Sequence, residues 1–153
     1  ARFPATLGGL NPDLRNLGDL VLEIVLGMGN ARPGRHDLYE QYRYSAAIRS
    51  GDFLFVSGQV GSRPDGSPEN DLPTQVRLAF QNLNSILEAA GCSFKDVIDV
   101  TVFMVNPEQN FEVAWPVVQE HWGEAPYPTL TGVGVTWLYG FQFEIKVIAK
   151  LPS

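Results

Sequence analysis

The sequence is poor in the residues that form covalent crosslinks and bind metals. Among 153 residues it has one cysteine, Cys92, and two histidines, His36 and His121. A lone cysteine cannot form a disulfide within the chain, and the histidines have no nearby cysteines at a metal-ligand spacing. We therefore expect neither an internal disulfide nor a structural zinc site.

Basic residues are also in the minority. Eleven lysines and arginines stand against seventeen aspartates and glutamates, which gives a formal net charge of -6. A surface with this balance repels a phosphate backbone. The sequence therefore argues against nucleic acid as a partner.

Long apolar runs are missing as well. The longest near the N-terminus, 20–28, is interrupted by Glu23 and Gly27. It is too short to cross a bilayer and lacks the basic flank of a signal peptide. We expect a cytoplasmic protein that does not enter a membrane.

Residues 1–35 form a predicted extension ahead of a domain over 36–153. Within it, residues 11–27 favour an amphipathic helix, because Asn11 can cap it, Pro12 suits its first turn and Gly27 can end it. Apolar residues recur every three or four positions along one side, at Leu14, Leu17, Val21, Ile24 and Met28. Residues 27–35 hold three glycines and a proline, which is typical of a linker.

The remainder alternates between strand and helix patterns in the order ββαβαββ. This order predicts an α+β domain in which helices cover a sheet. We expect a hairpin over 43–60 that turns at 50–52, a helix over 71–90, a strand over 97–105, a helix over about 111–122, and strands over 130–137 and 141–151. Pro116 is awkward inside the second helix and implies a kink or a later start.

Two strands show which of their faces is buried. In 97–105 the apolar positions Ile98, Val100, Val102 and Met104 alternate with Asp99 and Thr101. In the last strand the positions facing the helices are predicted to be Phe141, Phe143, Ile145, Val147 and Ala149. The opposite face carries Gln142, Glu144 and Lys146, which must meet water or another subunit, and Trp137 is expected nearby.

Three segments carry a family resemblance. RYSAAIRSGDFLFVSGQVG, LNSILEAAGCSFKDVIDVTVFM and GVTWLYGFQFEIKVIAKLP resemble the Rid (RidA/YjgF) family, and within it the YjgH-type branch, in order and spacing over about 34–152. The resemblance implies a chorismate-mutase-like fold, a mixed sheet with two helices on one face. It further implies a homotrimer with a central barrel and ligand clefts shared between subunits. The family's activity is the cofactor-free hydrolysis of 2-imino and enamine acids to 2-keto acids and ammonia.

The resemblance also implies a set of site residues. Tyr44 matches the family tyrosine that opens the first strand, Gly58 matches the cleft glycine, and Glu144 matches the final-strand glutamate that orients water. The family arginine that holds the substrate carboxylate does not carry over, because the sequence reads Thr129-Leu130-Thr131 there and has no arginine after Arg77. The expected substrate-binding residues are therefore Tyr44, Gly58, Thr129, Thr131, Trp137 and Lys146, with Glu144 catalytic.

Several alternatives remain open on the sequence. Lys146 either anchors a ligand in place of the arginine or simply pairs with Glu144. The protein is either an imine or enamine hydrolase or a non-catalytic binding module of the same fold. The endoribonuclease activity attached to this family fits poorly with the acidic charge. Cys92 is expected to be inert, and His121, beside Trp122, to take part in helix packing.

The role of the helix over 11–27 is open too. It can dock on the protein's own trimer, or it can act as an address that a bacterial microcompartment shell protein binds, a helix-in-groove mode of recognition. Membrane anchoring ranks lower because its polar face carries Asp19 and Glu23 in place of basic residues.

Overall fold

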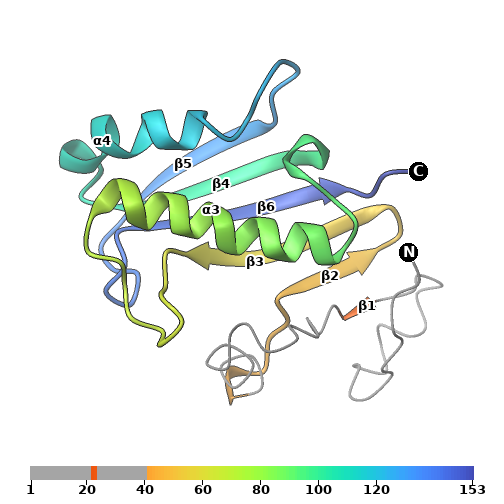
Figure 1. Ribbon diagram of the computed structural model, residues 1–153, viewed down its shortest axis with the longest axis horizontal. Coiled ribbons are helices and arrows are strands. Elements are labelled where there is room, and N and C mark those ends of the chain that lie inside the picture. The colour runs from red at the N-terminus through yellow and green to blue at the C-terminus, as the bar shows by residue number, and fades with distance from the viewer. Residues whose placement is uncertain (1–21, 24–40) are drawn as a thin grey trace.

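The domain is one mixed sheet with helices on a single face. The structure, a computed structural model, describes residues 22–23 and 41–153 (Figure 1). Its elements are β1 (Leu22–Glu23), β2 (Ala47–Ser50), β3 (Phe53–Val60), α3 (Leu72–Ala89), the short 3-10 helix η1 (Phe94–Asp96), β4 (Val97–Val105), α4 (Pro107–Gln119), β5 (Thr129–Val135) and β6 (Phe143–Lys150). The predicted α+β order and the hairpin at Gly51 are confirmed.

The sheet has the strand order β1-β2-β3-β6-β4-β5. β6 lies in the middle, antiparallel to both β3 and β4. β5 occupies the edge and runs parallel to β4. The two last strands are therefore not neighbours, and the turn that joins them passes the end of β4.

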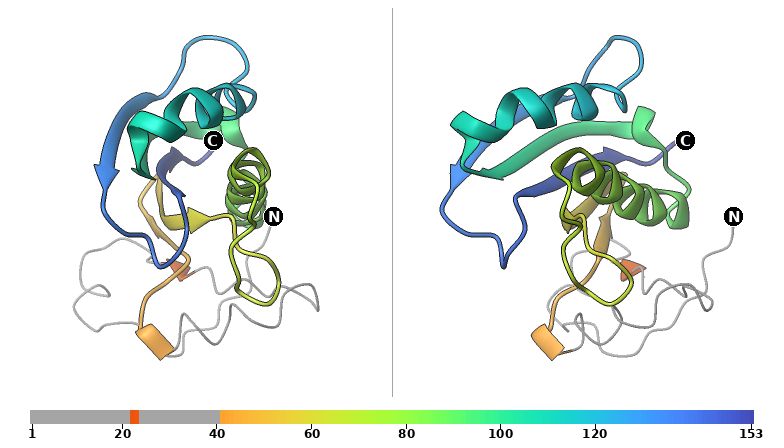
Figure 2. Two further views of the ribbon diagram at one scale, coloured as in Figure 1. Left: turned by 90° about the vertical axis from the view of Figure 1, so that its left-hand side faces the viewer. Right: turned by 60° about the vertical axis from the view of Figure 1, so that its left-hand side comes forward.

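Both helices lie against one face of the sheet, as Figure 2 shows. Asp71 begins α3, because its carboxylate accepts the backbone N–H of Thr74 at 3.1 Å. Gly91 follows the end of α3 with a φ of 74°, which glycine adopts without strain. The apolar stripe of α3 packs on buried side chains of β3, β4 and β6, so the predicted helix and its core face are confirmed.

The second helix differs from the prediction. α4 begins at Pro107, four residues before the expected position, and it ends at Gln119 instead of Trp122. Pro116 lies inside it without preventing helix formation. Pro116 and Glu112, whose carbonyl loses its intrahelical partner, are both exposed, so water can satisfy that carbonyl.

One position of β4 contradicts the predicted alternation. Ile98 was expected on the buried face but is 41% exposed. The pairing with β6 shifts between Val97 and Asp99, as it does at a β-bulge. This shift places Val97 in the core and turns Ile98 outward, while Val100, Val102 and Met104 stay buried as predicted.

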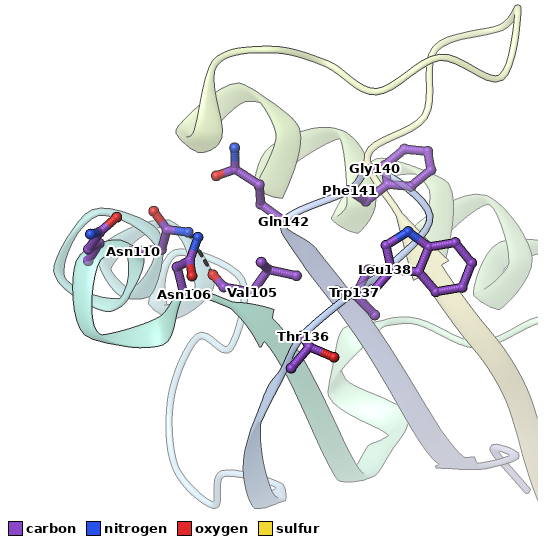
Figure 3. A pocket seen from close by; sticks show the side chains of 10 residues that line it. Val105, Asn106, Asn110, Thr136, Trp137, Leu138, Gly140, Phe141 and Gln142 are labelled. Atoms are coloured by element: carbon purple, nitrogen blue, oxygen red, sulfur yellow. Dashed lines mark hydrogen bonds between the residues drawn. The ribbon is translucent and has the colours of Figure 1, made fainter.

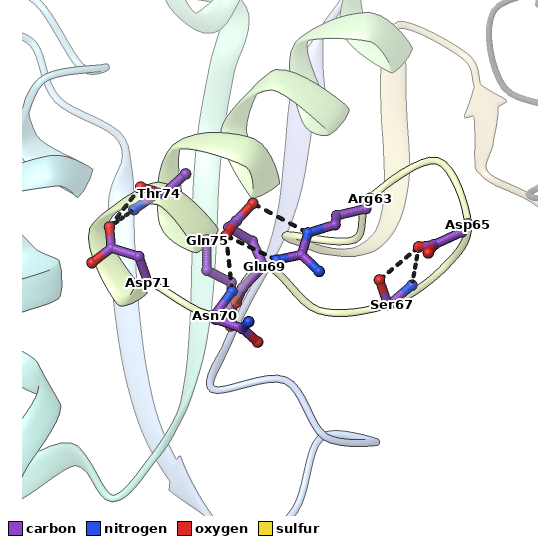
Figure 4. Close-up of polar contacts among 8 residues, drawn as sticks. All are labelled: Arg63, Asp65, Ser67, Glu69, Asn70, Asp71, Thr74 and Gln75. Atoms are coloured by element: carbon purple, nitrogen blue, oxygen red, sulfur yellow. Dashed lines mark hydrogen bonds and ion pairs between the residues drawn. The ribbon is translucent and has the colours of Figure 1, made fainter.

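A buried glutamine of α3 joins three segments around the start of the helix. Gln75 donates from Nε2 to Glu69 O at 2.6 Å and accepts the Gln142 N–H at Oε1 at 2.8 Å. Gly61 packs directly on its backbone, since a Cβ there would lie 2.1 Å from Gln75 O. Figure 4 shows Gln75 beside the loop that the Arg63–Glu69 ion pair, 3.2 Å long, also braces.

His121 is part of the helix packing, as expected, and Cys92 is a buried side chain. The His121 ring stacks on Phe80 with centroids 3.9 Å apart, and burial lowers the pKa of its imidazole. Cys92 is buried, and burial raises the pKa of its thiol, which disfavours the reactive thiolate.

The predictions for the N-terminal extension fall largely outside the described residues. The helix over 11–27 and the linker over 27–35 lie there, except for Leu22–Glu23. These two residues form β1, which pairs antiparallel with Arg49 and Ile48 of β2, in place of a helix. Among the described residues, no helix is both long and apolar enough to span a membrane.

Candidate functional site

Glu144 projects from the centre of the sheet on the face opposite the helices. Within β6 the alternation is as predicted, with Phe143, Ile145, Val147 and Ala149 in the core, but Phe141 and Gln142, which were expected to continue it, lie before the strand. Glu144 therefore lies on the uncovered face, between Val60 of β3 and Phe103 of β4 in the strand register. Its nearest cross-strand neighbours are thus apolar.

Gly58 makes room for this carboxyl group. The register of β3 against β6 shifts between Val56 and Gln59, so Gly58 lies in an irregular stretch of strand. A Cβ at Gly58 would lie 2.6 Å from Cδ of Glu144 and 2.9 Å from its Oε2. The backbone at Gly58 therefore lies directly against the carboxyl group of the glutamate that the sequence singled out.

The segment that carries Tyr44 is fastened beside Gly58. The Ser57 hydroxyl donates to Ser45 O at 2.6 Å, and the Ser57 N–H donates to Ala46 O at 2.9 Å. Tyr44 itself is 46% exposed. The structure therefore brings the Tyr44 segment, Gly58 and Glu144 to one part of the outer face.

The carboxyl group of Glu144 is half-buried and is hydrogen-bonded to none of the described residues. Its burial raises the pKa of the Glu144 carboxyl above the ordinary glutamate value, and the Lys146 charge offsets this only partly. A carboxylate with such a pKa accepts a proton more readily near neutral pH than an exposed one does.

Lys146 and Thr131 lie in the adjacent row of the same face. Thr101 of β4 pairs with Lys146 on one side and with Thr131 on the other. Lys146 is exposed and forms no ion pair with Glu144, so the simple pair considered for these two residues is not formed within the described chain. The ammonium group is therefore available to a ligand.

Two other predicted site residues are placed elsewhere. Oγ1 of Thr129 lies 2.6 Å from Asp99 Oδ1 and 3.0 Å from Ile98 O, so its hydroxyl is engaged at the sheet edge. Trp137 lies beyond the end of β5, two strands away from β6, and its ring is 3.9 Å from that of Tyr139. The register within one chain brings neither residue to Glu144.

Trp137 instead borders a pocket that the sequence did not reveal. A pocket of about 310 Å³ lies where β4 and β5 end, between the start of α4 and the β5–β6 connection (Figure 3). Its polar lining includes Asn106, which immediately precedes α4, and Gln109 and Asn110 of the first turn of α4, which follow Asn106 at spacings of three and four. This spacing is a signal that could have indicated the pocket.

The described residues hold no cluster of three or more histidine, cysteine, aspartate or glutamate side chains suited to a metal ion. The fold and the outer face define a small α+β domain whose central strand presents a desolvated carboxyl group. The family model described as Endoribonuclease L-PSP matches residues 35–151. The chain therefore belongs to this family, which is the Rid/YjgF family.

Similar proteins agree with this assignment. The RutC family protein YjgH of Escherichia coli is 64% identical over 120 residues, which cover 78% of this chain and 92% of that protein. A solved structure of YjgH has a TM-score of 0.73 at 62% identity and covers 80% of this chain and 94% of that one. The resemblance to the YjgH branch is thereby confirmed.

More distant relatives carry functional names. A 2-iminobutanoate/2-iminopropanoate deaminase of Dermatophagoides farinae is 30% identical over 97 residues, 62% of this chain and 74% of that protein. The crystal structure of Escherichia coli TdcF with bound serine has a TM-score of 0.66 at 33% identity and covers 71% of this chain and 88% of that one.

Proposed function

We propose that this protein hydrolyses small imines or enamines to carbonyl compounds and ammonia at the carboxyl group of Glu144. The observation that carries the proposal is the half-buried Glu144 carboxyl, which lies against the Gly58 backbone and has a raised pKa. The deaminase named among the relatives supports this reaction class.

The chemistry requires only the side chain and water. The Glu144 carboxylate accepts a proton from water while the water oxygen bonds to the imine carbon. The same carboxyl group returns that proton to the nitrogen, which gives a carbinolamine. It then transfers the hydroxyl proton of the carbinolamine to the nitrogen as the carbon–nitrogen bond breaks and the carbon–oxygen double bond forms, which releases ammonia and leaves a carbonyl group. No cofactor takes part in either step.

Substrate anchoring must differ from the arginine-based pattern of the family. Lys146 lies in the row next to Glu144 and is not ion-paired, so in our proposal it attracts an anionic group of the substrate. Thr131 and the Gly58 backbone would bind polar atoms, and Tyr44 would border the cleft. A single ammonium gives a weaker, less directional anchor than a guanidinium fork.

In this proposal three copies of the chain form a trimer, and each cleft is shared between two adjacent copies. The face that carries Glu144 is not covered by the helices, and it exposes Phe53 and Phe55 at 41% and 43%. Packing these faces together would form a central barrel with helices outside, and it would bring Thr129, Thr131 and Trp137 of one copy toward Glu144 of another.

The test is ammonia release from freshly generated imines by the purified protein. Wild type should accelerate release, and Glu144→Gln should lower the rate by about 100-fold or more, the contribution typical of general acid–base catalysis. Lys146→Met should mainly raise KM for substrates with a carboxylate. The same substitution at exposed Glu112, Glu112→Gln, is the control. If no imine is turned over faster than without protein, the proposal is wrong.

A non-catalytic binding module is the rival reading, because no arginine stands at Thr129-Leu130-Thr131. Thermal stabilisation by small acids or amides without turnover would favour it. Cleavage of RNA, which the family description names, is not what we propose, since the chain has a net charge of -6.

Residues 11–27 would serve as an address for a microcompartment shell, in a protein that otherwise resides in the cytoplasm. This proposal rests on the amphipathic pattern of the sequence alone. Residues 1–30 fused to a fluorescent reporter should concentrate in shells of a microcompartment-forming host, and a diffuse signal there would refute the proposal.

A further inference from the structure

The pocket at the ends of β4 and β5 is built from uncharged polar groups. Asn106, Gln109, Asn110 and Gln142 contribute four carboxamides, and Thr136 contributes a hydroxyl. Among the described residues, no lysine, arginine, aspartate, glutamate or histidine lines it. Its volume of about 310 Å³ suffices for a small metabolite. Glu144 of the same chain is not part of this lining.

Most of these carboxamides are not used by the protein. Asn110 donates from Nδ2 to Val105 O at 2.7 Å. Asn106 precedes α4 but makes no side-chain capping bond, and the side chains of Gln109 and Gln142 bond to none of the described residues. Each unused carboxamide offers a donor and an acceptor to a ligand.

The walls of the pocket are fixed before any ligand arrives. The Gln142 backbone is held on both sides, by Gln75 Oε1 at its N–H and by the Val105 N–H at its carbonyl, at 2.8 and 3.0 Å. The turn in the β5–β6 connection is held by a hydrogen bond from the Phe141 N–H to Leu138 O at 3.0 Å.

Backbone strain gathers at the same place. Three described non-glycine residues have positive φ, and two of them, Asn106 at 48° and Tyr139 at 55°, lie in or next to the pocket. Such conformations cost free energy and persist where the surrounding structure enforces them, often at binding sites.

The chemistry of the walls indicates the ligand class. Figure 3 shows the amides of Asn106, Asn110 and Gln142 on one side and the rings of Trp137 and Phe141 on the other. Trp137 is 62% exposed, so its indole can receive a flat partner. A charged ligand would meet no counter-ion among the described residues that line the pocket. We propose that this pocket binds a small uncharged ligand in which a flat ring carries a carboxamide.

Nicotinamide and nicotinate are a matched pair of probes, since they share the ring and differ in an amide against a carboxylate. The chain has three tryptophans, so the full-length protein labelled with nitrogen-15 gives three indole N–H signals. Trp137→Phe identifies one of them by its loss. Nicotinamide should shift the Trp137 signal and leave those of Trp115 and Trp122 in place, and nicotinate should bind at least tenfold more weakly.

Two substitutions test the amide side. Gln142→Met removes a carboxamide at similar size, and Asn106→Gly removes another while tolerating the positive φ. Each should weaken nicotinamide binding by about three- to tenfold, the net value of one hydrogen bond. Gln81→Met, at an exposed glutamine of α3, should have no effect.

The proposal is overturned if nicotinate shifts the Trp137 signal as strongly as nicotinamide does. It is also overturned if no shift occurs at millimolar nicotinamide, or if both substitutions leave the affinity unchanged while the protein remains folded. The readout is binding alone, so it is independent of whether the protein hydrolyses imines.

Discussion

At the scale of single residues, Glu144 is placed where a charge is disfavoured. Its neighbours across the sheet are Val60 and Phe103, and no hydrogen bond from the described chain reaches its carboxylate. A half-buried carboxylate without hydrogen bonds destabilises the folded protein, and such groups cluster at functional sites. Gly58 is needed for this placement, because a methyl group at that position would displace the Glu144 carboxyl group.

Glu144→Gln should stabilise the folded protein near neutral pH. The pKa of Glu144 is higher in the folded than in the unfolded protein. The contribution of this group to the free energy of unfolding is therefore fully present below the ordinary glutamate pKa, and it is lost as the pH rises through the folded-state pKa. In Glu144→Gln the side chain is uncharged at every pH, so the variant does not lose this stability as the pH rises. Urea unfolding should show a gain for the variant at neutral pH that vanishes below about pH 4. A gain that is the same at both pH values would contradict the assignment of the raised pKa.

Sequence reasoning found residues whose placement depends on strand periodicity. Glu144 and Lys146 lie on the predicted face because alternation along one strand fixes it. Thr129 could not be interpreted in this way, since its hydroxyl is engaged by Asp99, thirty positions away. The carboxamide of Gln142 joins those of α4 only because β6 is inserted beside β4, a pairing that no local pattern reveals.

At the scale of elements, α3 is fastened to the sheet at its first turn. Gln75 bonds the loop before it and the segment that leads into β6, and Gly61 lies against its backbone. These contacts set how closely the helix approaches the end of β3.

Gly61→Ala should therefore destabilise the protein strongly. The new methyl would lie 2.1 Å from the Gln75 carbonyl oxygen, a backbone atom that cannot rotate away. We expect a loss near the upper end of the range of about 1–3 kcal/mol that overpacking costs. Urea denaturation measures it. Gly132→Ala on β5 is the control, because a Cβ there meets nothing within 4 Å. Equal losses in the two variants would show that close packing at Gly61 is not the cause.

The elements themselves were largely predictable, and their exceptions have local causes. α3 matches the helix predicted over 71–90, because apolar residues recur there at helical spacing. α4 begins at Pro107, before the expected start near residue 111, and Pro116 delays it no further, because water can bind the exposed Glu112 carbonyl that Pro116 leaves without a partner. The exposure of Ile98 follows from a shift in pairing with β6, which a single strand's pattern does not contain.

At the scale of the whole molecule, the two faces of the sheet differ in what covers them. Helices cover one face, while Phe53, Phe55 and Val133 remain exposed on the other. Exposed aromatic groups on a flat surface commonly mark a contact between proteins. We therefore expect the oligomer to depend on this face.

Phe55→Glu should convert the proposed trimer to a monomer, because three buried carboxylates without partners would oppose assembly. Light scattering after size-exclusion chromatography measures the mass. Phe111→Glu is the matched control, since Phe111 is 48% exposed but lies on α4. A monomeric wild type, or a Phe55→Glu variant that keeps the wild-type mass, would refute the proposed assembly.

The central position of β6 has a consequence for synthesis. β6 follows every other strand of the sheet in sequence, yet it lies between β3 and β4. Until residues 143–150 have been synthesised, the hairpin and the parallel pair are two separate halves with a gap between them. The sheet can close only after these residues have left the ribosome, and until then the apolar surfaces of the two halves are exposed to aggregation or to chaperones.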